Sequence, residues 1–111
     1  MGATTQSDLL PGTLDLLILK TLVRGRLHGY NIAQHVKTVS DDVLQVGESS
    51  LYPALQRLLL KGWVTAEWGS SENNRRARYY TLTASGRKQL VVERREFDRL
   101  VVAIHKVLNT T

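Results

Sequence analysis

The stretch Val46-Gly-Glu-Ser-Ser-Leu-Tyr-Pro-Ala-Leu-Gln-Arg-Leu-Leu-Leu-Lys61 decides how this chain is organised. Its leucines recur at helical spacing and predict one buried stripe, formed by Leu51, Leu55, Leu58 and Leu59. The other side is polar with little charge and carries Ser49, Tyr52, Pro53, Gln56 and Arg57. A short helix with such a face suits base recognition in a major groove. An ordinary amphipathic core helix explains the same spacing, so this stretch alone leaves both interpretations open.

The expected ends of this helix are Ser50 and Lys61. The serine pair Ser49 and Ser50 suits an N-cap, and Pro53 would then fall near the first turn, where backbone amides lack intrahelical partners. Gly62 stops the helix. We therefore expect a candidate recognition helix over residues 50–61.

Composition limits the possible functions. The chain has 111 residues, 15 Lys plus Arg against 10 Asp plus Glu, and a net charge of +5, which favours a polyanionic partner. This length predicts one domain with no room for a separate catalytic unit. The absence of cysteine excludes disulfides and thiolate metal sites. With no secretion signal and no apolar stretch long enough for a bilayer, we expect a cytoplasmic protein without a membrane partner.

A helix is predicted before the central stretch, from a cap at Thr13 to a stop at Gly25, after a polar tail (1–8) and a turn at Pro11 and Gly12. Its apolar residues lie on two sides. One side carries Leu14, Leu17, Ile18 and Leu22, and the other carries Leu16, Leu19 and Val23. A helix that is apolar on two sides must be covered on both, and the simplest second cover is another subunit.

A second short helix is predicted to open at His28-Gly29-Tyr30 and to finish near Ser40, with residues 41–47 as a connector. Ile32, Ala33 and Val36 would face inward. Two helices joined by a short connector, the second rich in groove-reading side chains, indicate a helix-turn-helix.

Two strands are predicted after Gly62, over residues 63–68 and 78–82, with a polar loop over 69–76. Arg75, Arg76 and Arg78 flank the tip of this hairpin. Three arginines by themselves are most simply a solvated loop. Directly after a helix-turn-helix, however, a basic hairpin indicates a wing that reaches phosphates or a minor groove.

The last segment is predicted as a helix capped by Thr83 and running to Leu108, roughly 40 Å long, which is too long for so small a domain to cover. It could fold back on its own core, but its apolar spacing indicates a seam for an intermolecular helix pair. The seam residues are Leu90, Phe97, Val101, Ile104 and Leu108.

Nothing in the sequence indicates catalysis. Asp41 and Asp42 are adjacent and point apart in most conformations, and no recognisable motif anchors a Ser-His-Asp arrangement. His28 and His35 lie seven apart and could share a helix face, but no carboxylate at the right spacing completes a metal site. We expect no enzyme activity, no cofactor and no bound metal.

Five segments, in this order, resemble the PadR family of transcriptional regulators, and the likeness extends from Leu9 to Leu108. They are Leu10-Pro-Gly-Thr-Leu-Asp-Leu-Leu-Ile-Leu19, Leu27-His-Gly-Tyr30, Ser49-Ser-Leu-Tyr-Pro-Ala-Leu-Gln-Arg-Leu58, Glu72-Asn-Asn-Arg-Arg-Ala-Arg-Tyr-Tyr80 and Leu82-Thr-Ala-Ser-Gly-Arg87. The single C-terminal helix resembles the short members of that family. Some short members bind flat aromatic compounds between tryptophans of the dimer helix, whereas here Trp63 and Trp68 lie in or beside the wing.

The resemblance implies a mostly α fold with a small β-hairpin (α+β): a winged helix-turn-helix over 9–83 and a dimerisation helix over 84–111. It implies a homodimeric repressor that binds an inverted-repeat operator in double-stranded DNA and that an unidentified small-molecule effector releases. The DNA side would comprise Tyr30, Ser49, Ser50, Tyr52, Pro53, Gln56 and Arg57, with Arg75, Arg76 and Arg78 on the wing. The dimer interface would comprise Leu16, Leu19, Val23, Leu90, Phe97, Val101, Ile104 and Leu108. The alternative function is a winged helix that docks another protein, since one fold serves both purposes.

Overall fold

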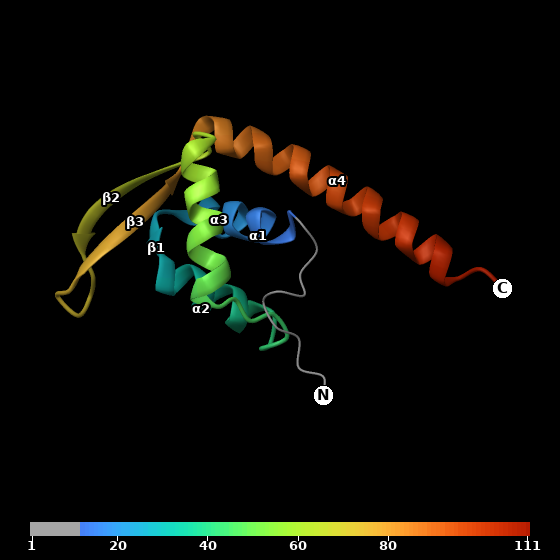
Figure 1. Cartoon of the computed structure of the whole chain (residues 1–111), viewed down its shortest axis with the longest axis horizontal. Helices are drawn as coiled ribbons and strands as arrows, with labels where there is room; N and C mark the ends of the chain where they lie inside the picture. The colour runs from blue at the N-terminus through green and yellow to red at the C-terminus, as the bar shows by residue number, and fades with distance from the viewer. Residues whose placement is uncertain (1–11) are drawn as a thin grey trace.

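The computed structural model describes residues 12–111 as an α+β winged helix in which a small sheet and a long last helix extend from a helical body (Figure 1). The predicted tail (1–8) and the turn at Pro11 lie outside the described residues. The elements, in chain order, are α1 (Thr13–Thr21), the 3-10 turn η2 (Leu22–Arg24), β1 (Leu27–His28), α2 (Gly29–Val39), α3 (Glu48–Leu60), β2 (Val64–Ser70), β3 (Arg76–Leu82) and α4 (Ala84–Leu108).

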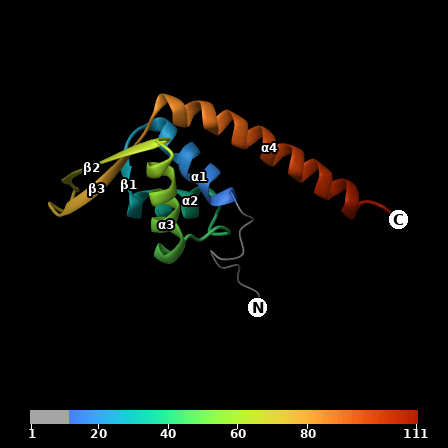
Figure 2. The same ribbon diagram turned by 45° about the horizontal axis from the view of Figure 1, so that its top comes forward.

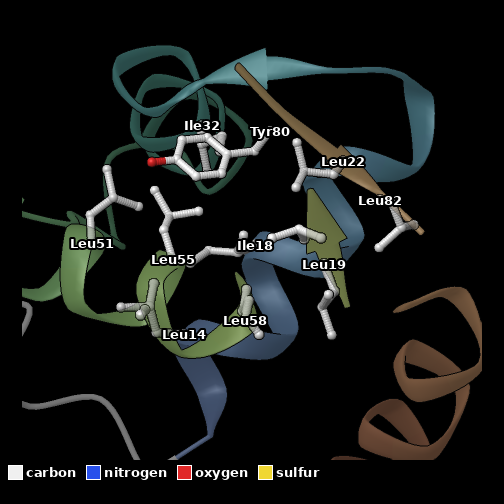
Figure 3. Close-up of a cluster of buried hydrophobic side chains, with 12 residues drawn as sticks. Leu14, Ile18, Leu19, Leu22, Ile32, Leu51, Leu55, Leu58, Tyr80 and Leu82 are labelled. Carbon is white, nitrogen blue, oxygen red and sulfur yellow. The ribbon is translucent and has the colours of Figure 1, made fainter. Parts of the chain in front are cut away.

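α1 lies at the centre of the hydrophobic core and packs against α2, α3 and α4 (Figures 2 and 3). Its apolar side chains are buried on more sides than one, which explains why they keep to no single face. Leu19 is 0% exposed and packs inside its own chain, so the prediction that it faces a second subunit is wrong. Leu17, on the side that also carries Leu14 and Ile18, is only half-buried. The buried α1 residues are Leu14, Asp15, Leu16, Ile18, Leu19 and Thr21.

Both ends of α1 differ from the prediction. Gly12 occupies the N-cap position with a φ of 86°, a left-handed conformation that glycine adopts at little cost, and Thr13 is already helical. At the other end the chain tightens into η2 before it turns at Gly25. Gly12 therefore provides the sharp entry that a threonine cap was expected to provide.

The sheet contains a strand that the sequence did not reveal. β1 pairs with β3 through Leu27 opposite Tyr80, giving the antiparallel order β1-β3-β2. A two-residue strand has no detectable alternation, so only the tertiary pairing defines it. The two wing strands are confirmed and are longer than expected, because Ser70 pairs with Arg76 and leaves residues 71–75 as the loop.

α3 begins at Glu48, two residues before the predicted start. Its N-cap is Gly47, and no side chain caps the helix, so the predicted serine cap is wrong. Pro53 consequently lies in the second turn and has no amide hydrogen to donate to the carbonyl of Ser49. Both residues are exposed, so this break in the hydrogen-bond ladder faces solvent rather than the core.

α4 begins at the predicted cap. The Thr83 hydroxyl accepts a hydrogen bond from the Gly86 amide at 2.9 Å and donates one to the Gly62 carbonyl at 2.8 Å. Its early turns lie over α1, and its later turns leave the body (Figures 1 and 2). Among the helices that the structure describes, none combines the length and apolar character needed to span a bilayer.

Candidate nucleic-acid interface

The two sides of α3 divide as the sequence predicts. The inner side packs into the core through Leu51, Ala54, Leu55 and Leu58. The outer side carries exposed Ser49, Tyr52, Pro53, Gln56 and Arg57, while Ser50 is half-buried. A polar helix face is thereby left open on the surface of the body.

Tyr52 joins this face to the start of α2. Its side chain is 46% exposed, and its ring lies so close to Gly29 that a Cβ there would stand 2.9 Å from the Tyr52 hydroxyl oxygen. Partial burial raises the pKa of the Tyr52 phenol, and the nearby Glu48 and Tyr80 raise it further. Tyr52 therefore stays neutral near pH 7 and keeps its hydroxyl as a hydrogen-bond donor. Tyr30, the first side chain after Gly29, is also exposed.

Arg57 makes an ion pair with α1. Its Nη2 donates to Oδ1 of Asp15 at 2.9 Å, and the aspartate side chain is only 12% exposed whereas the arginine is 51% exposed. The buried carboxylate thus has a cation partner at the edge of the α1–α3 contact. The remaining N–H groups of a guanidinium leave capacity for a second acceptor. The DNA contact of Arg57 stays a prediction, since Arg57 also has this structural role.

The alternation of side chains along β3 determines which face of the wing each arginine occupies. Arg76 and Arg78 lie on the same face of β3 as the buried Tyr80, whereas Arg75 belongs to the loop. Trp68 of β2 stands directly opposite Arg78 on this face. We call this side, which continues the core-facing surface of the sheet, the inner face of the wing.

The outer face of the wing is organised differently. Arg26, just before β1, stacks 4.4 Å from the ring centre of Tyr79 and lies 3.6 Å from the carboxylate of Glu67. The Tyr79 hydroxyl donates to the Ser70 carbonyl at 2.9 Å. Charges on this face are therefore partly neutralised within the chain.

The two histidines, which could have shared a helix face had both belonged to one helix, lie in different elements, His28 in β1 and His35 in α2. His28 Nε2 instead lies 3.7 Å from Glu72 in the wing loop. Within residues 12–111, no cluster of three or more histidine or carboxylate side chains is arranged to hold a metal ion.

A second surface lies along α1 and α4. A groove of about 1030 Å³ runs between them and is lined by apolar residues, among them Leu16, Leu17, Leu90, Phe97 and Val102. Its charged lining residues are Lys20, Arg94, Arg95, Asp98, Arg99 and Lys106. Beyond it, Ile104 and Leu108 of the predicted seam are exposed, while Leu90, Phe97 and Val101 are half-buried and Val23 packs on the core. Further exposed apolar side chains of α4 are Val91, Val92, Leu100, Val102 and Val107.

Sequence reasoning missed two residues of these surfaces, Asp15 and Trp68. Asp15 was detectable as the one acidic residue between the leucines of α1, but its partner lies 42 positions away. Trp68 was placed in the wing without a role, since its neighbours on the inner face follow only from the strand register.

Sequence comparisons agree with this arrangement. Residues 18–92 match the transcriptional regulator PadR-like family. The chain is 31% identical over 85 residues to "Uncharacterized protein X" of Lysinibacillus sphaericus, covering 77% of this chain and 78% of that protein. It is 31% identical over 77 residues to the negative transcriptional regulator PadR of Bacillus subtilis (strain 168), covering 69% of this chain and 42% of that protein.

Solved structures are similar too. A transcriptional regulator from Clostridium thermocellum superposes with a TM-score of 0.78 at 29% identity, over 86% of this chain and 92% of that one. A PadR family transcription regulator from Clostridium difficile R20291 gives 0.70 at 26% identity, over 86% and 98%. Bacillus subtilis PadR in complex with operator DNA gives 0.62 at 31% identity, over 70% and 44%. With the family match over most of its length and a winged helix whose polar face is open, the chain belongs to the PadR-like family of transcriptional regulators.

Proposed function

We propose that this protein is a homodimeric repressor that binds an inverted-repeat operator through α3 and the wing. The observation that carries the proposal is the open outer side of α3, where Tyr52 and Gln56 are exposed beside a basic wing. Hydroxyl, amide and guanidinium groups are the ones that read base edges, while wing arginines supply phosphate affinity. Tyr30, Ser49, Ser50, Pro53 and Arg57 complete the proposed DNA side, with Arg75, Arg76 and Arg78 on the wing.

Dimerisation is proposed from the apolar surface of α4. Val107 and Leu108 are among its most exposed apolar side chains, and the nearby α1–α4 groove is lined mainly by apolar surface. Apolar surface of this extent is rarely left to water, and the heptad-like spacing of the seam suits a second helix. A twofold dimer would present two α3 helices to successive major grooves, which is the geometry that an inverted repeat requires.

The regulatory output is proposed by analogy with the relatives. The Bacillus subtilis protein is named a negative regulator and has been crystallised with operator DNA, although this chain spans only 42% of that protein's length. We therefore propose repression, with release by a small-molecule effector.

The test is a salt titration of duplex binding, using a duplex that the purified protein selects from a random library. We expect log affinity to fall linearly with log salt, with a slope of roughly 0.9 per phosphate neutralised. Light scattering should report a dimer at the same protein concentration. A failure to bind duplex DNA at low salt would refute the proposal and favour the protein-docking alternative.

A further inference from the structure

We propose that Trp68 and Arg76 form a preassembled contact for the DNA backbone, in which the Arg76 guanidinium binds a phosphate and the Trp68 indole packs against the adjacent deoxyribose. This inference rests on the proposed DNA binding and adds an aromatic residue to it. The site occupies the inner face of the wing, near the end of the hairpin that carries the loop at 71–75.

The geometry of the pair supports this role. The Arg76 guanidinium carbon stands 4.7 Å from the centre of the Trp68 ring, a cation–π contact. Arg78 lies across the strand pair from Trp68 and 6.0 Å from the ring centre of Tyr80. Arginine and aromatic side chains thus alternate along the inner face, from the buried Tyr80 toward the tip. Stacking restricts the Arg76 side chain, so less rotamer entropy remains to be lost when it binds a phosphate.

Charge distinguishes the two faces of the wing. Arg26 on the outer face has Glu67 within salt-bridge distance. On the inner face, neither Arg76 nor Arg78 has a carboxylate within 4.0 Å among residues 12–111. The inner face therefore presents positive charge that the described part of the chain does not neutralise, which suits a polyanion.

The exposure of Trp68 is not explained by packing within the wing. The side chain is 57% exposed at a position where its ring buries little apolar area. An indole on a basic hairpin offers a flat apolar surface that can cover a sugar in or beside a minor groove, as the apolar side chains of minor-groove proteins do. Trp63, at the other end of the same hairpin, is half-buried against the core and is not part of this surface.

The experiment measures the affinity of Trp68→Ala, Trp68→Phe, Arg76→Ala and the alanine double variant for the library-selected duplex. We expect each single alanine change to weaken binding roughly tenfold, and the double variant to lose little more, because the two side chains act as a unit. Trp68→Phe should recover most of the affinity, since it keeps an aromatic face. Lys61→Ala is the matched control. Lys61 stacks on Trp63 at the same distance of 4.7 Å, and its substitution also removes one positive charge, but Lys61 lies away from the wing tip.

Fluorescence supplies a second measurement that does not depend on truncation. In a Trp63→Phe background Trp68 is the only tryptophan, and saturation with the selected duplex should change its emission intensity. An affinity of Trp68→Ala within twofold of wild type, or unchanged Trp68 emission at saturation, would overturn the inference while the proposed function stands. A wild-type protein that selects no duplex would overturn both.

Discussion

The ion pair between Asp15 and Arg57 leads to a prediction that separates folding from DNA recognition. Arg57→Ala would remove the only cation within 4.0 Å of the Asp15 carboxylate among the described residues. That carboxylate is 12% exposed and lies among the leucines of α1, so the substitution would leave a buried carboxylate without its cation partner. We therefore expect Arg57→Ala to destabilise the fold in the absence of any DNA.

The magnitude follows from the geometry of the pair. Two unit charges at the observed 2.9 Å attract by about 6 kcal/mol at an effective dielectric constant of about 20, and desolvation offsets most of that gain. Breaking a fully buried pair costs about 3–5 kcal/mol, whereas an exposed pair contributes at most about 1 kcal/mol. With Asp15 buried and Arg57 half-exposed, we expect a loss of about 2 kcal/mol in the free energy of unfolding.

The assay is urea denaturation followed by circular dichroism, with every variant at one protein concentration because dimer formation contributes to stability. Asp15→Asn keeps the shape and removes the charge that needs a partner. The double variant Asp15→Asn/Arg57→Ala should therefore be no less stable than Arg57→Ala alone. A loss below about 0.5 kcal/mol for Arg57→Ala, with strictly additive effects in the double variant, would refute this reasoning and leave Arg57 free to serve DNA alone.

Three further outcomes are expected. Gly86→Ala should destabilise the fold by about 3 kcal/mol, because the added Cβ would collide with the carbonyl oxygen of Trp63. Thermal melts measure the loss, and the control Ser85→Ala, at an exposed neighbouring position, should melt like wild type. Ile104→Asp should convert the proposed dimer to a monomer in light scattering by placing a charge in the seam; a variant that remains dimeric would exclude this part of α4 from the interface. The Tyr52 phenol, whose pKa is raised by burial and then by neighbouring groups, favours the protonated form in the folded state, so its contribution to stability is complete below about pH 10 and declines as pH rises through the folded-state pKa. Wild type should therefore lose stability above that pH more steeply than Tyr52→Phe in denaturant titrations, and parallel curves would contradict the assignment.

Local sequence patterns determined most elements of this protein. The leucine spacing of α3, the Thr83 cap of α4 and the alternation of the wing strands each depend on residues close together in the chain. Residue spacing and capping chemistry act over a few positions, and therefore sequence reasoning finds the order and type of such elements. The unusual apolar character of α1 was equally visible, although the sequence did not show that the chain itself covers Leu19.

Contacts between distant segments were decided only by the tertiary structure. The two-residue β1 exists because β3 pairs with it, and Leu19 is covered by the chain's own core rather than by a second subunit. Asp15 meets Arg57 only when α1 packs against α3, and Arg76 meets Trp68 only in the observed register of the hairpin. Burial and charge pairing depend on which surfaces come together in space, and spacing along a single sequence does not contain that information.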